Sequence, residues 1–209
     1  MTLSDEQKTI CEAILSMIPG ESIYVDGEAG TGKSFCLDIA TEPIPNMIRC
    51  AANALAANNI KGRTFHKVFQ LRGSLYLDPA NWAARKSKII ADLVELNGLK
   101  SATGAIYKEA GMLMSRQMHP ARQKCLAEAG GIWVDEIPTL RCDLLDEADV
   151  RLRHVMKKQK IPFGGMKMIF SGDLGQLQPV VTKDEIPALE EAGYEAPFGF
   201  QQSRVLRGY

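Results

Sequence analysis

The sequence has little of what marks membrane, disulfide-rich or zinc-binding proteins. No apolar run in its 209 residues approaches the roughly 18 needed to span a bilayer. The polar start MTLSDEQKTI has no basic segment followed by an apolar stretch, so no secretory signal is predicted. The 5 cysteines are odd in number and contain no C-x-x-C pair, which favours reduced thiols over disulfides or a zinc site. We therefore expect an intracellular protein, cytoplasmic or nuclear (or nucleoid-associated), that is not secreted and has no membrane partner.

Net charge is also absent, but the charges are segregated along the chain. The 25 Lys+Arg balance the 25 Asp+Glu, yet residues 49–72 and 151–167 contain basic residues and no acid, and residues 184–195 contain acids and no base. The two basic segments could converge on one surface that binds a polyanion. They could equally be solvated faces balanced by acids elsewhere. The charge pattern leaves both alternatives open.

The remaining composition, 45% hydrophobic and 24% charged, is that of a globular domain. Its length predicts one domain, or one domain with a sizeable insertion. Apolar runs predict strands at 22–26, 47–51, 131–134 and 166–170, separated by stretches long enough for helical crossovers. This alternation predicts an α/β fold with a mainly parallel sheet covered by helices on both faces.

One helix is predicted before the first of these strands, and a second helix and a helical insertion are predicted between later ones. Ser4 can cap a helix with the apolar stripe Ile10, Ile14, Met17 and Ile18, which Pro19-Gly20 ends. A second helix starts at Lys33 and must end near Pro43. From about 75 to 130 no strand is evident, and apolar residues recur at helical spacing (Trp82, Ile89, Ile90, Leu93, Leu96). This region is predicted to be an inserted helical element.

A phosphate-binding loop follows the first predicted strand. Residues 27–34 fit G-x-x-x-x-G-K-[ST] at every position, between a strand and a helix. Glycines let successive backbone N–H groups surround phosphates, and the helix N-terminus adds its positive end. Lys33 is expected to reach the β- and γ-phosphates of ATP, and the Ser34 hydroxyl to ligate Mg²⁺. The predicted nucleotide-binding residues here are Gly27, Glu28, Ala29, Gly30, Thr31, Gly32, Lys33, Ser34 and Phe35.

Acidic and amide side chains end two further strands. The run Ile132-Trp133-Val134 ends in Asp135, expected to hold Mg²⁺, and Glu136, expected to polarise an attacking water. Gln176 follows the strand at 166–170 in a polar turn, where it could report the presence of the γ-phosphate. Lys33, Glu136 and Gln176 are therefore the predicted catalytic residues, and Ser34 and Asp135 the predicted metal ligands.

Together these blocks resemble the first RecA-like domain of a superfamily 1B DNA helicase of the Pif type. Residues 172–180 resemble G-D-x-x-Q-L-P-P-V, with Gln178 at the first proline. Residues 135–137 resemble D-E-[IV]-S-M, with Pro138-Thr139 where Ser-Met is usual. Residues 3–7 resemble L-[ST]-x-x-Q, whose Gln reads the adenine edge, which implies this role for Gln7. The resemblance implies a RecA-like P-loop NTPase and, for the parent family, roles in DNA repair, recombination and telomere maintenance.

A further stretch, 54–69, resembles the family segment A-x-x-A-x-x-I-x-G-x-T-[IF]-H-x-x-F that lies along single-stranded DNA. Ala52-Asn53 replaces the usual Thr-Gly before it. The resemblance implies DNA contacts for Arg63, Thr64, His66 and Lys67. A histidine can also be a satisfied core or turn residue. The insertion falls where related helicases carry a small strand-separating subdomain, and residues 198–200 resemble the last strand of the first motor domain.

The family motor has two RecA-like domains, and this chain is expected to be the first, over 1–209, without the second. The second domain, in cis or in trans, would supply arginines to the γ-phosphate. Three functions remain open: an ATP-dependent DNA helicase of 5′-to-3′ polarity, a short nucleotide-responsive DNA-binding module without unwinding activity, and a P-loop kinase. The kinase is disfavoured because kinases need a basic lid and rarely pair Asp-Glu with G-D-x-x-Q.

Overall fold

A single parallel sheet organises the computed structural model, which describes residues 3–71 and 118–207. The five strands are β1 (Ser22–Asp26), β2 (Ile48–Ala51), β3 (Arg63–Thr64), β4 (Ile132–Asp135) and β5 (Met168–Gly172), in the spatial order β1-β5-β4-β2-β3. Every pairing is parallel. The predicted α/β class and the four predicted strands are confirmed, whereas the two-residue strand β3 was not predicted.

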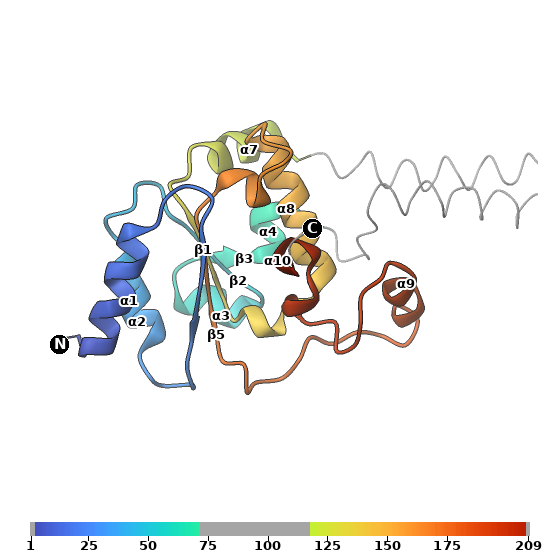
Figure 1. Cartoon of the computed structure of the whole chain (residues 1–209), viewed down its shortest axis with the longest axis horizontal. Coiled ribbons are helices and arrows are strands. Elements are labelled where there is room, and N and C mark those ends of the chain that lie inside the picture. Colours follow the sequence, from blue (N-terminus) through green and yellow to red (C-terminus); the bar gives the residue numbers. More distant parts are fainter. Residues whose placement is uncertain (1–2, 72–117, 208–209) are drawn as a thin grey trace, which may run out of the picture.

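Helices cover both faces of the sheet, and Figure 1 shows α1 and α2 on one side with α4, α7 and α8 on the other. The first face carries α1 (Asp5–Ser16), α2 (Lys33–Thr41) and α3 (Ala54–Asn59). The second carries α4 (Phe65–Phe69), α7 (Pro120–Ala127), α8 (Cys142–Val155) and the 3₁₀ turn η2 (Pro162–Gly165). Side chains alternate between the two cores along each strand, because successive residues of a strand point to opposite faces. On β4, Trp133 packs in the first core and Val134 in the second.

Helix α1 begins as its sequence predicts. The Ser4 hydroxyl accepts from the Gln7 backbone N–H, and the Gln7 side chain accepts from the Ser4 N–H, forming a capping box. The helix ends at Ser16, with Met17 as C-cap. Ile14 and Met17 are buried, but Ile18 is 62% exposed. The prediction that Ile18 belongs to the buried apolar stripe of this helix was wrong, because Ile18 follows the C-cap and is directed to solvent.

The predicted insertion at 75–130 is described only in its last part. Helix α7 falls in this last part, and its Leu126 lies fully buried in the core on the α8 side of the sheet. The residues that defined the helical spacing, from Trp82 to Leu96, lie outside the described residues.

The segment 198–200 is not a strand, contrary to prediction. Gly199 makes only an isolated antiparallel bridge to Arg141, and the chain then enters the 3₁₀ turn η3 (Phe200–Gln202). Phe198 and Phe200 pack into two different hydrophobic clusters. Residues 198 and 200 of a strand would point to the same face. Because the two phenyl rings instead pack in separate cores, the backbone turns at this point. The C-terminal part also contains the 3₁₀ turn η1 (Ile137–Thr139), α9 (Ile186–Glu191) and α10 (Arg204–Arg207).

The two basic segments lie at different edges of the sheet. Residues 157–167 connect the end of α8 to the amino end of β5, whereas β3 and α4 lie at the carboxyl end of β2. Arg49, Arg151 and Arg153 are already paired with Asp38, Glu147 and Asp149. Residues 157–167 and the residues of β3 and α4 therefore lie at opposite ends of the strands. Over residues 3–71 and 118–207, no helix is long and apolar enough to cross a membrane.

Candidate nucleotide and nucleic-acid site

The predicted chemical residues follow the carboxyl ends of the strands. The glycine-rich loop 27–32 follows β1, Glu136 follows β4, and Asp173 follows β5. Because all five strands are parallel and β1, β5 and β4 are neighbours, these three segments meet at one edge of the sheet. In open α/β sheets this edge is where ligands bind.

The loop 27–32 has the conformation that a phosphate cradle needs. Gly30 and Gly32 have φ of 85° and 83°, the left-handed region that residues with a Cβ seldom adopt. Gly32 is the N-cap of α2, so the free N–H groups of the first helical turn face the loop. The Lys33 ammonium donates to the carbonyls of Gly27 and Glu28, the latter at 2.8 Å. The lysine is thus held over the loop, while Ser34 and Phe35 are exposed in the first turn of α2.

Gln7 lies against the same loop. Its Nε2 is 3.5 Å from the Thr31 carbonyl oxygen, to which it donates. A Cβ at position 32 would come within 3.1 Å of that Nε2. The tertiary structure therefore places the end of the Gln7 side chain at the loop, although its amide oxygen is used in the cap of α1.

The tip of β4 holds Glu136 in a strained and partly enclosed position. Its φ of 54° and ψ of 38° are left-handed, which is uncommon for a residue other than glycine and concentrates at functional sites. The Thr139 hydroxyl and N–H both donate to the Glu136 carbonyl, at 2.9 and 3.2 Å, and so fix this turn. The Glu136 Oε2 is buried without a hydrogen-bond partner. An unpartnered buried carboxylate oxygen is available to a ligand.

The surroundings of Glu136 raise the pKa of its carboxyl group. Burial, and then the neighbouring Asp135, raise the pKa of Glu136 above its usual range, and Asp173 adds to the effect. Lys33 acts in the opposite direction. A carboxylate with a raised pKa is a better general base than an ordinary glutamate.

The tips of β4 and β5 are packed against each other. A Cβ at Gly172 would lie 2.3 Å from the Pro138 ring, so only glycine fits there. After it, Asp173 Oδ1 accepts from the Gly175 N–H at 2.9 Å, and the Leu174 N–H donates to Asp26 Oδ1 at 3.3 Å. The turn that carries Gln176 is thus tied to the strand that leads into the phosphate loop.

The carboxyl edge also offers ligands suited to Mg²⁺. Asp135 is only 6% exposed and directly precedes Glu136 at the carboxyl edge of the sheet. The phosphate loop lies at the same edge and leads into the first turn of α2, which carries Ser34. A hydroxyl and a carboxylate, completed by phosphate and water oxygens, form the hard oxygen set that Mg²⁺ prefers. The residues present therefore fit the metal.

The predicted DNA-contact residues divide into two kinds. Arg63 and Lys67 are exposed. The Thr64 hydroxyl is the N-cap of α4 and accepts from the Lys67 N–H. His66 is half-buried, and burial followed by the nearby Arg141 lowers its pKa. Of these four residues, only Arg63 and Lys67 are exposed to solvent.

Known proteins are similar in sequence to most of this chain. A family model for PIF1-like helicases matches residues 2–118 and 101–196. The chain belongs to the PIF1-like helicase family. The ATP-dependent DNA helicase PIF1 of Homo sapiens is 26% identical over 187 residues, 88% of this chain and 24% of that protein. That of Saccharomyces cerevisiae is 31% identical over 189 residues, 87% of this chain and 18% of that protein.

The fold of this PIF1-like chain agrees with solved Pif1 structures. A Bacteroides Pif1 helicase, crystallised with ADP-AlF3 and single-stranded DNA, superposes with a TM-score of 0.74 at 27% identity, covering 98% of this chain and 39% of that one. The expected RecA-like fold is thereby confirmed. The chain spans less than half the length of these relatives.

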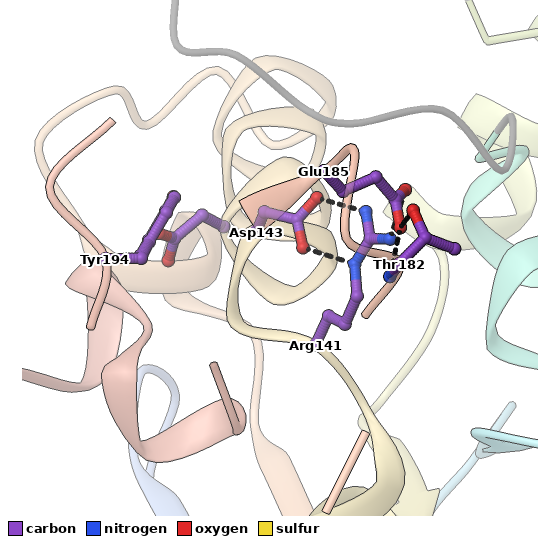
Figure 2. Close-up of polar contacts among 6 residues, drawn as sticks. Arg141, Asp143, Thr182, Glu185 and Tyr194 are labelled. Carbon is purple, nitrogen blue, oxygen red and sulfur yellow. Dashed lines mark hydrogen bonds and ion pairs between the residues drawn. The ribbon is translucent and has the colours of Figure 1, made fainter. Parts of the chain in front are cut away.

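In this PIF1-like chain, the segment after Gln176 is anchored to the start of α8, as Figure 2 shows. The Arg141 guanidinium makes two hydrogen bonds to Asp143, at 2.9 and 2.7 Å, and a third to Glu185 at 2.8 Å. The other Glu185 oxygen accepts from the N–H and hydroxyl of Thr182. Tyr194 donates to the buried Asp146 at 2.6 Å. These contacts fix the path of the chain after the turn that carries Gln176.

Two residues that support this site, Trp133 and Ser171, were not predicted from the sequence. Both are fully buried, and Trp133 Nε1 donates to Ser171 Oγ, which donates in turn to Asp135. The sequence feature that could have indicated Ser171 is a single hydroxyl residue directly after the apolar run 168–170.

Proposed function

We propose that this chain is the first motor domain of an ATP-dependent DNA helicase of 5′-to-3′ polarity, in which ATP binding and hydrolysis are coupled to single-stranded DNA binding. The observation that carries the proposal is the meeting of three segments at one sheet edge: the glycine-rich loop, the Asp135-Glu136 turn and the turn with Gln176. The relatives named above, which are ATP-dependent DNA helicases, support it.

The residues take distinct roles in this proposal. The loop N–H groups and Lys33 bind the phosphates, and Gln7 reads the adenine edge. Ser34 and Asp135 hold Mg²⁺, which when bound neutralises charge on the phosphate oxygens. Glu136 accepts a proton from the attacking water, and Gln176 contacts the γ-phosphate. Arg63 and Lys67 bind the DNA backbone, with Thr64 and His66 beside them.

The domain organisation belongs to the same proposal. Residues 1–209 form the first RecA-like domain, with the helical insertion at about 75–130, and a second RecA-like domain in cis or in trans completes the site. An arginine supplied across such an interface contributes about 10³–10⁵ in rate. We therefore expect the chain alone to bind ATP and hydrolyse it slowly, without unwinding.

The test is ATP hydrolysis with and without single-stranded DNA, using Lys33→Ala as the blank. ATP binding with slow turnover that DNA increases supports the proposal. Nucleotide binding equal in the parent chain and Lys33→Ala contradicts it. Phosphate transfer to an added nucleoside monophosphate would instead favour a kinase.

A further inference from the structure

A buried chain of hydrogen bonds ends on Asp135. Trp133 Nε1 donates to Ser171 Oγ at 2.7 Å, and Ser171 Oγ donates to Asp135 Oδ1 at 2.6 Å. Trp133 and Ser171 are 0% exposed, and Asp135 is 6% exposed. Polar groups this deeply buried must be hydrogen-bonded, because an unsatisfied one costs about 1–3 kcal/mol.

The register of the sheet brings these three residues together. Trp133 and Asp135 are two positions apart on β4, so both point to the face covered by α1 and α2. Trp133 pairs with Ile169 and Val134 with Phe170. Continuing that register sets Asp135 beside Ser171 on β5, with the Ser171 side chain on the same face.

Trp133 determines which way the Ser171 hydroxyl points. An indole N–H can only donate, so its bond to Ser171 must use an oxygen lone pair. The single hydroxyl proton is then left for Asp135, which as a carboxylate can only accept. The Ser171–Asp135 bond is therefore directed from serine to carboxylate, and it occupies Oδ1.

The Trp133 indole is contacted by Arg49 of β2, which is bonded to helix α2. The Arg49 guanidinium lies 5.7 Å from the centre of the Trp133 ring. Arg49 forms an ion pair with Asp38 and donates to the Thr41 hydroxyl at 3.4 Å. Both of these partners belong to α2, the helix that begins at Lys33.

We propose that Ser171 is a positioning residue, which fixes the orientation of the Asp135 carboxylate so that Oδ2 is directed to Mg²⁺ bound with the nucleotide. Trp133 acts through Ser171 by orienting its hydroxyl. The inference rests on the proposed function, since it concerns the same nucleotide site. Groups that hold a metal ligand in place typically change metal affinity about 10- to 100-fold when removed.

The test is the Mg²⁺ dependence of binding of a fluorescent ATP analogue, compared between the parent chain and Ser171→Ala. We expect Ser171→Ala to need about tenfold more Mg²⁺ for half-maximal binding, while binding of the analogue in EDTA is unchanged. Ser171→Thr, which keeps the hydroxyl, should restore most of the Mg²⁺ response. Trp133→Phe, which removes the indole donor together with part of the ring but leaves the Ser171 hydroxyl in place, should give a smaller shift.

A matched control separates positioning from fold stability. Ile169→Val removes one methyl group from a fully buried residue on the same strand and face, and it should leave the Mg²⁺ midpoint unchanged. The inference is overturned if Ser171→Ala shifts the midpoint by less than about twofold, or if Ile169→Val shifts it equally. If the parent chain itself binds no analogue beyond the Lys33→Ala blank, the proposed function fails first and the inference fails with it.

Discussion

The two outer strands of the sheet carry functional segments that are held in different ways. At the β1 edge, Lys33 is bonded to loop carbonyls, and Asp26 at the end of β1 accepts a hydrogen bond from the turn that carries Gln176. Further into the sheet, after the central strand β4, hydrogen bonds from Thr139 fix the turn of Glu136. At the β3 edge, Arg63 and Lys67 are exposed side chains on a two-residue strand and a short helix. Four strand spacings separate these edges, which is about 19 Å at the usual 4.8 Å per strand.

This difference reflects the chemistry expected at each edge. Phosphoryl transfer requires groups fixed to a fraction of an ångström, so redundant contacts hold them. Binding a polyanion depends on the number of positive charges and tolerates mobile side chains. Substitutions at the β1 edge should therefore have large, specific effects, and those at the β3 edge small, additive ones.

The largest expected effect is that of Lys33→Ala. The variant loses the expected charge-assisted hydrogen bonds from Lys33 to the β- and γ-phosphates. At about 1.5 kcal/mol each, their loss should weaken nucleotide binding on the order of 100-fold. Isothermal titration with ATP and Mg²⁺ measures it, with Lys8→Ala as a control for loss of an exposed positive charge on α1. Equal affinities for Lys33→Ala and the parent chain would mean that the loop does not bind phosphates.

Glu136→Gln should leave ATP affinity unchanged and reduce turnover about 10²- to 10⁴-fold, because the amide cannot accept the proton of the attacking water. Phosphate release in single-turnover mixtures measures this, and a binding titration on the same sample is the control. Unchanged turnover would show that another group is the general base.

Arg63→Ala combined with Lys67→Ala tests the β3 edge. We expect weaker single-stranded DNA binding. The slope of log binding constant against log salt concentration should become less negative by roughly 1.4, because each phosphate contact to a single strand contributes about 0.7. ATP affinity should not change, because the two edges are far apart. Lys124→Ala, at an exposed lysine of α7, is the control, and an equal effect there would indicate non-specific attraction.

Thr64→Ala tests whether Thr64 contacts DNA or only stabilises the fold as the N-cap of α4. Loss of the N-cap of α4 should lower the free energy of unfolding by about 1 kcal/mol, measured by urea denaturation, and Thr64→Ser should restore it. A loss of DNA affinity at unchanged stability would assign Thr64 to the DNA instead.

The smallest effect concerns Glu185, which ties the segment after Gln176 to α8. Hydrogen bonds from Thr182, and then those from Arg141, lower the pKa of Glu185 against the effect of burial. Its contribution to stability is therefore present above its unfolded pKa of about 4.3 and is lost as pH falls through the lower folded value. The thermal midpoint of Glu185→Gln should be below that of the parent chain at pH 7, and the difference should shrink as the pH falls below the unfolded pKa of about 4.3. Glu190→Gln, at an exposed acid of α9, should show no difference over this pH range.

Local signals in the sequence predicted much of the nucleotide edge. The capping box of α1, the glycines before Lys33 and the acids at the end of β4 depend on residues a few positions apart. Such short-range patterns survive in any tertiary context, so the strands and the loop were found. The roles given to these residues stay predictions until the variants are measured.

Long-range packing could not be predicted in the same way. Strand β3 is a strand only because it pairs with β2. Helix α8 buries Asp143, Asp146, Glu147 and Asp149, which its sequence alone would direct to solvent. Asp146 is accommodated because Tyr194, Ser203 and two backbone N–H groups near residue 204 donate to it.

The sequence by itself determined the fold class, the phosphate loop and the order of the chemical motifs, because alternating apolar runs and contiguous motifs encode them locally. Tertiary structure alone decided that Gln7 lies at the loop, that Gly199 turns away from the sheet, and that Trp133 orients Ser171 toward Asp135. Each of these depends on strand register or on contacts between segments far apart in the chain, which no short stretch of sequence specifies.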